Sequence, residues 1–227
     1  MRHSPSKSWV TGLVAAATAL LLSACGDGLA PGVAAEVDGE QITTAEVDDL
    51  ATVICEIDKG AGQTGTPVAA QRATALTVLL GIEVGRRIGD VDSVPQQQVT
   101  QSLQAASQAR EFVPDDLKDY FDEVIRESTR SAAAVDAAAA ANLREQGEQP
   151  EPTAVQEETA RLQQAYLEEH PVEVDPRFGV YQNGQVVSGD GSLSVAVSDR
   201  AKSFVPQGTD DGSAQPAADL PASQVCG

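Results

Sequence analysis

One segment, residues 67–88, is apolar around most of its circumference and constrains the fold more than any other part of the sequence. A helix of this kind is normally buried on most sides, near the centre of a protein. Its length of about 22 residues would also suit a membrane span. Five polar or charged side chains argue against a span: Gln71, Arg72, Glu83, Arg86 and Arg87. The sequence therefore predicts a central core helix with other helices packed around it.

Other segments have the three- and four-residue apolar spacing of amphipathic helices. The first begins at the capping box Thr43-Thr-Ala-Glu46 and ends near Lys59-Gly60, a cation followed by a helix-stopping glycine. Thr66-Pro67 is a favourable N-cap and first-turn pair for the central helix. Ser93-Val-Pro-Gln96 resembles a second capping box and predicts the start of a polar helix.

Two further helices are expected in the second half of the chain. One opens at Pro114, and the alanine-rich stretch 132–143 either continues it or forms a separate helix. The sequence breaks over 147–152, and the last helix then runs from Thr153 to Pro171. Its predicted inward residues follow helical spacing: Val155, Thr159, Leu162 and Tyr166.

Strand patterns lie at both ends of this helical region. Residues 33–37 alternate weakly, Asp38-Gly39 is a strong hairpin turn, and 40–42 return. Residues 172–187 and 193–197 have the two-residue period of short strands. The fold class is therefore predicted as mainly α, with a small β element formed by N-terminal and C-terminal strands. One domain is expected over residues 33–197, followed by a Pro/Ser/Ala-rich tail over 198–227 that we expect to be disordered.

The N-terminus has the features of a bacterial export signal. Basic residues precede an apolar stretch over 9–22, and this stretch is short for a stable membrane helix. Leu22-Ser-Ala-Cys25 resembles the lipobox of bacterial lipoproteins, which implies cleavage before Cys25 and acylation of that cysteine. The sequence thus predicts a signal peptide over 1–24, a lipidated tether over 25–32, and a protein on the extracytoplasmic face of the cell membrane. The alternative is an ordinary cleaved signal with a chance cysteine.

The charge of the chain limits the ligands that it can bind, and its cysteine content bears on the compartment in which it folds. The chain has 34 acidic and 15 basic residues, a formal charge of -19, which argues against binding nucleic acid or anionic lipid through charge. The simplest interpretation is that this charge keeps an anchored protein soluble. Apart from Cys25 the chain contains Cys55 and Cys226, and two cysteines in an oxidising compartment usually pair. A Cys55–Cys226 disulfide is predicted.

The inventory of reactive residues does not favour an enzyme. Beyond the signal the only histidine is His170, at a predicted helix end, so histidine-dependent triads and multi-histidine metal sites lack their residues. The acidic pairs Asp48-Asp49, Asp115-Asp116 and Glu168-Glu169 are adjacent, and adjacent side chains on a helix point about 100 degrees apart. We therefore expect solvated faces there, and predict no catalytic residue, metal or cofactor.

The segment 33–50 resembles the start of the SurA N-terminal chaperone domain, which is shared in outline with PrsA-type foldases and trigger factor. The matching motifs are Val37-Asp-Gly39, Ile42-Thr43 and the acidic helix start Glu46–Leu50. Similarly, Val174–Gly179 resembles the closing strand of that family, which returns to pair with the first strand.

One departure from the family is large. Full foldases carry a parvulin prolyl isomerase domain before the last helix, where this chain has only residues 147–152, and it lacks the parvulin histidines. The resemblance therefore implies a helical peptide-binding module for unfolded or nascent secreted polypeptides, without isomerase activity. Two alternatives stay open: an envelope adaptor or scaffold that binds one partner, and a divergent prolyl isomerase.

Overall fold

The computed structural model describes residues 29–187 and 221–226. The predicted signal peptide, Cys25, the expected strand over 193–197 and most of the tail lie outside these residues. The described part contains the helices α1 (Thr44–Gly60), α2 (Val68–Ile88), α3 (Gln96–Ala105), α4 (Ser107–Arg110), α5 (Lys118–Glu145) and α6 (Pro152–Glu169). Short 3-10 turns are η1 (Val91–Ser93), η2 (Asp115–Leu117) and η4 (Ala222–Gln224). The predicted mainly α fold is confirmed.

The strands form three small antiparallel sheets. In the first, β1 (Val33–Val37) lies between β2 (Glu40–Thr43) and β4 (Glu173–Val174). In the second, β5 (Val180–Gln182) pairs with β6 (Gln185–Val187), and in the third β3 (Thr66–Pro67) pairs with β7 (Val225–Cys226). The pairing of Ala35 with Val174 confirms the expected union of an N-terminal and a C-terminal strand. Both hairpins turn through left-handed residues, Asp38-Gly39 and Asn183-Gly184, as these dipeptides predict.

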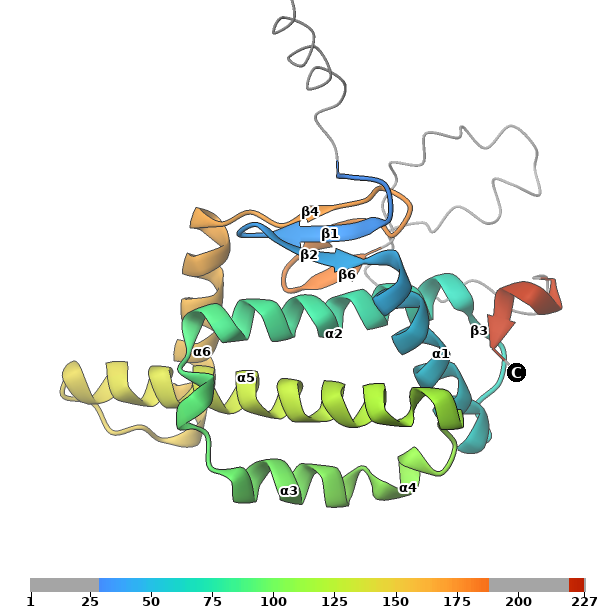
Figure 1. Ribbon diagram of the computed structural model, residues 1–227. Helices are drawn as coiled ribbons and strands as arrows, with labels where there is room; N and C mark the ends of the chain where they lie inside the picture. Colours follow the sequence, from blue (N-terminus) through green and yellow to red (C-terminus); the bar gives the residue numbers. More distant parts are fainter. Residues whose placement is uncertain (1–28, 188–220, 227) are drawn as a thin grey trace, which may run out of the picture.

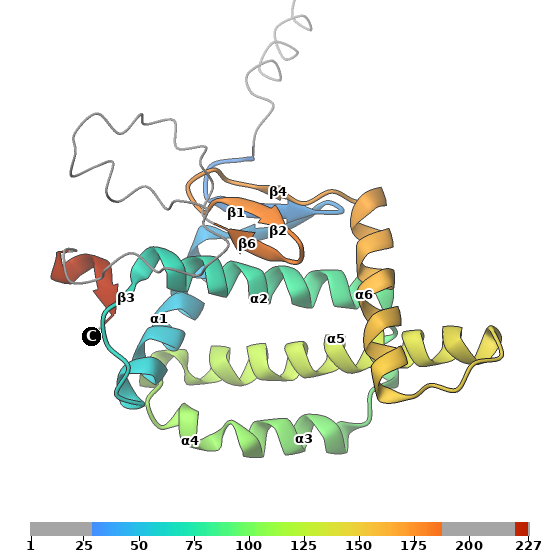
Figure 2. The same cartoon turned by 180° about the vertical axis from the view of Figure 1, so that it is seen from behind.

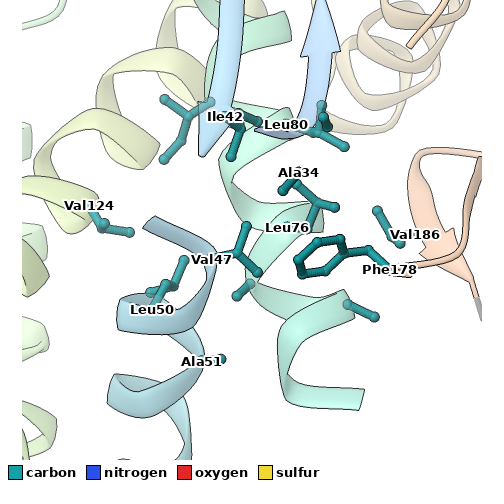
Figure 3. Packing of buried hydrophobic residues seen from close by; sticks show 14 of the residues in the cluster. Ala34, Ile42, Val47, Leu50, Ala51, Leu76, Leu80, Val124, Phe178 and Val186 are labelled. Atoms are coloured by element: carbon teal, nitrogen blue, oxygen red, sulfur yellow. The ribbon is translucent and has the colours of Figure 1, made fainter. Parts of the chain in front are cut away.

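The helices are stacked beside the first sheet. Figures 1 and 2 show α2, α5 and α3 as successive layers below the strands, with α6 crossing at one end. The side chains of Leu76 and Leu80 on α2 are fully buried, and the packing around them includes Val47 from α1 and Phe178 from the segment after β4 (Figure 3). Among the described residues only α2 is long and apolar enough to cross a bilayer. Its position between the sheet, α1 and α5 is that of the predicted core helix.

Helices α2 and α5 approach closely because glycines lie at the crossing, Gly85 within α2 and Gly89 at its C-cap. A Cβ atom on Gly85 would lie 2.7 Å from the Cβ of Ser131, and one on Gly89 would lie 2.4 Å from the carbonyl carbon of Ala134. A Cβ atom on Gly81, one turn before Gly85, would have no neighbour within 4 Å. The helix α5 is continuous through this crossing, so the alanine-rich stretch extends the helix that opens after Pro114 and does not form a separate one.

Of the three predicted N-caps, one is confirmed and two are wrong. The Thr43 hydroxyl accepts from the Glu46 amide at 3.2 Å, and Glu46 accepts from the Thr43 amide at 2.8 Å, which completes the capping box. Thr66 does not cap α2, because it lies in β3 opposite Cys226. Ser93 does not cap α3, because it lies in η1 and its hydroxyl donates to the Asp90 carbonyl. In both cases the N-cap is the following proline, Pro67 or Pro95, which has no side-chain acceptor.

One expected helix end is confirmed, and one further expectation needs correction. Helix α1 ends at Gly60, as the sequence predicts, and the left-handed turn follows at Gly62, with φ of 77°. A Cβ on Gly60 would meet the Phe112 ring, so its lack of a side chain serves packing. The expectation of disorder is wrong for residues 221–226, which form η4 and β7. The predicted disulfide and a strand partner fix this segment, and the strand pairing does not follow from its composition.

Candidate functional site

A cavity of about 710 Å³ lies between α2, α6 and the β5–β6 hairpin, and we call it the α6 groove. Its lining residues come from these three elements and from two residues after the end of α6. Its α6 wall consists of Ala160, Gln163, Gln164, Leu167 and Glu168, and Pro171 and Val172 follow. The remaining lining residues are Gly81 and Val84 from α2 and Tyr181, Asn183 and Gly184 from the hairpin. None of these residues was singled out from the sequence as a site residue.

The α6 wall is a single helical stripe. Its members recur at intervals of three and four residues, which places them on one side of the helix. The stripe that we predicted to face inward, containing Val155 and Leu162, is half-buried and lies on a neighbouring side. Because α6 has few apolar residues, only part of its circumference packs against the domain. The adjacent stripe is left to line the groove.

A buried carboxylate fixes α6 to α5. Glu158, only 7% exposed, accepts from the Asn142 amide at 2.5 Å and from the guanidinium of Arg161. The hydrogen bonds from Arg161 lower the pKa of Glu158, so the buried side chain stays ionised and paired. A second bond joins Thr159 to Asp136 at 3.0 Å. These polar contacts position the groove wall, and the apolar periodicity of α6 gave no indication of them.

The far end of α6 is held by the only histidine of the described residues. His170 is the C-cap of α6, and its Nδ1 lies 3.2 Å from Oδ1 of Asp38 in the β1–β2 turn. The Tyr166 hydroxyl donates to the other Asp38 oxygen at 3.2 Å, and the Tyr166 and His170 rings stack with centroids 4.5 Å apart. Burial and the neighbouring carboxylate raise the pKa of Tyr166. His170 thus occupies the helix-end position that the sequence predicts.

The opposite wall of the groove is anchored to α2. The Val186 amide donates to the Thr77 hydroxyl at 2.9 Å, and the Val186 side chain is buried, so the β5–β6 hairpin is fixed against the helix. Burial raises the pKa of Tyr181, which keeps its phenol neutral and able both to donate and to accept hydrogen bonds.

The lining of the groove combines apolar residues with polar groups, most of which are neutral. Side-chain amides come from Gln163, Gln164 and Asn183, and each amide can donate and accept. Leu167, Val172 and Tyr181 provide apolar surface between them. Glu168 adds one carboxylate to the lining. Apolar contacts and hydrogen bonds are therefore both available to a ligand in this groove.

A second, smaller cavity of about 220 Å³ lies between β2, α1, α2 and α5. Four glutamates contribute to its lining, and Arg86 joins two of them, Glu83 at 2.9 Å and Glu127 at 2.6 Å. Burial raises the pKa of Glu83, and burial together with nearby carboxylates raises the pKa of Tyr120 to about 12. Across the described residues no group of three or more potential metal ligands comes together.

The predicted cysteine pair is bonded in the structure. Cys55 on α1 and Cys226 on β7 form a disulfide with their Cα atoms 5.5 Å apart. The carbonyl of Cys226 also accepts from the Gly65 amide at 2.8 Å. The C-terminal strand is therefore held both to the end of α1 and to the residues before α2. The predicted lipidation residue, Cys25, lies outside the described residues.

One sequence signal could have pointed to the groove. The polar stripe at 160, 163, 164, 167 and 168 has helical spacing but too few apolar residues to be a core face. Comparison of the chain with models of known families, with curated proteins and with solved structures found no match.

Proposed function

We propose that this protein is a membrane-anchored extracytoplasmic lipoprotein whose helical domain binds unfolded segments of secreted proteins in the α6 groove, without catalysis. The observation that carries this proposal is the groove itself. Its volume of about 710 Å³ falls in the range of sites that bury most of a ligand. Its walls are fixed by the contacts of Glu158, Tyr166 and Val186, so the site exists before a ligand arrives.

The lining matches the surface of an unfolded chain. An extended polypeptide presents backbone donors and acceptors in alternation with side chains, and unpaired backbone groups need partners when water is removed. The amides of Gln163, Gln164 and Asn183 can satisfy such groups whatever the client sequence. Leu167 and Val172 offer apolar contact to client side chains. The pairing of β1 with β4 also supports the proposal, because it is the arrangement that the SurA resemblance implies.

Blocking the groove is expected to remove the activity. The protein from residue 26 onward should suppress aggregation of an unfolded client at stoichiometric amounts, as followed by light scattering. Gly81→Leu should abolish that suppression, because a side chain at this open position projects into the groove and a helix tolerates leucine. Ala137→Leu places the same leucine side chain at an exposed position of α5 and should have no effect. Unchanged client aggregation at an excess of the unaltered protein would remove the chaperone proposal.

Crosslinking in cells separates the chaperone from the other functions. Many crosslinked secreted proteins favour the chaperone, whereas one dominant envelope protein favours a dedicated adaptor on the same groove. Catalysed cis-to-trans conversion of a proline peptide would instead support the divergent isomerase, which we do not expect.

Replacement of Cys25 tests the proposed membrane anchor. Cys25→Ser should prevent acylation and release the protein from the membrane fraction, as measured by incorporation of a labelled fatty acid and by fractionation. A tether of about seven residues reaches roughly 25 Å when extended, so β1 would stand close to the bilayer. Lys7→Gln changes the signal without altering the acceptor and serves as the control. Acylated, membrane-bound Cys25→Ser protein would contradict the anchor.

A further inference from the structure

We propose that the α6 groove selects client segments that contain lysine or arginine over segments that contain aspartate or glutamate, and that Glu168 is the residue that sets this preference. The inference rests on the proposed function, since it names the class of peptide that the same groove takes. The proposed preference follows from the carboxylate in the groove lining and from the hydrogen bond that orients it.

Glu168 is the only side chain of the groove lining that is charged at neutral pH. Oε1 of Glu168 accepts from the Gln164 side-chain amide at 3.0 Å, and Gln164 belongs to the same stripe one helical turn earlier. This bond holds the carboxylate on the groove side of α6. The groove therefore presents one oriented negative charge among neutral amides and apolar groups.

No basic side chain neutralises this carboxylate within the described residues. The nearest arginine on α6, Arg161, forms its ion pair with the buried Glu158 and is not part of the lining. Of the ion pairs formed by the described residues, none includes Glu168. A cationic group of a ligand would meet a carboxylate that has no ion-pair partner among residues 29–187 and 221–226, whereas an anionic group would meet repulsion.

Apolar surface beside the carboxylate suits the shape of a basic side chain. Lysine and arginine place an aliphatic stem on apolar surface and keep the charged head in a polar setting. Leu167 precedes Glu168 on α6, and Val172 comes directly after Pro171. The groove therefore offers apolar surface for the stem and a carboxylate for the charged head. The formal charge of -19 on the chain adds a long-range preference of the same sign, which salt weakens.

The test uses the full chain, purified in detergent micelles, and three short fluorescent peptides of equal apolar content. They differ at two central positions, which are lysine, glutamine or glutamate, and binding is measured by fluorescence anisotropy at low and at physiological salt. We expect affinity in the order lysine, glutamine, glutamate. Glu168→Gln should weaken the lysine peptide by about threefold and leave the glutamine peptide unchanged, the size typical of an exposed charge pair.

Glu169→Gln is the matched control, because it removes the same charge from the next residue, which is exposed and outside the groove lining. Retained lysine preference in this variant, together with its loss in Glu168→Gln, supports the proposal. Equal losses in both variants overturn the role of Glu168, and equal affinity of the unaltered protein for all three peptides overturns the selectivity while the groove keeps its function. Absence of binding to any of the peptides overturns the proposed function itself.

Discussion

Replacing both Cys55 and Cys226 by serine is expected to lower the free energy of unfolding by about 5 kcal/mol. The bond joins residues 171 apart in the sequence, so its loss releases the entropy of a long closed loop in the unfolded chain. The measurement is urea unfolding of the protein from residue 26 onward, followed by circular dichroism.

The same experiment under reducing conditions provides the control. Reductant should destabilise the unaltered protein by a similar amount and leave the double serine variant unchanged. Loss of the bond should also free β7 from β3, because one short strand pair and the Gly65 hydrogen bond are weak alone. Thiol labelling of both cysteines in folded, unreduced protein would show that no bond exists and would sink this prediction.

The second large effect is expected at the α2–α5 crossing. Gly89→Ala should cost about 3 kcal/mol, because the new methyl group would lie 2.4 Å from backbone atoms of Ala134 and the two helices would have to separate. Backbone conformation does not contribute, since φ at Gly89 is -116° and alanine adopts it freely. Thermal and urea unfolding measure the change.

Gly81→Ala is the control on the same helix. No atom lies within 4 Å of the added group, and alanine favours a helix over glycine by about 0.5–1 kcal/mol, so this variant should be equally or more stable. Gly85→Ala should be destabilised, because its new methyl group meets the buried Ser131. Equal stability of the Gly81 and Gly89 variants would contradict the close crossing.

The sequence predicts most of the fold where local patterns and burial agree. The apolar segment 67–88 becomes the central helix, the capping box at Thr43 starts α1, and Asp38-Gly39 turns the first hairpin. The cysteine pair is predicted from the number of cysteines and the expected oxidising compartment. In the other three cases one short-range signal decides the structure.

The parts that the sequence does not predict depend on contacts between distant segments. Thr66 has the chemistry of an N-cap, yet it pairs with Cys226 because the disulfide brings a strand beside it. Glu158 is buried against α5 because Asn142 and Arg161 satisfy it, and helical periodicity cannot reveal such a partner. The groove arises in the same way, from the placement of α6 across α2 and beside a hairpin that follows it in the chain.

The position of β1 between β2 and β4 also has a consequence for the order of assembly. A polypeptide emerges from a ribosome or a translocon with its N-terminus first, so β1 and β2 become available early. The other partner of β1, beginning at Glu173, follows only after helices α1 to α6. Until then one edge of β1 is open to pairing with any strand nearby. Completion of the sheet is therefore a late event, and the newly emerged chain needs protection from its neighbours during that interval.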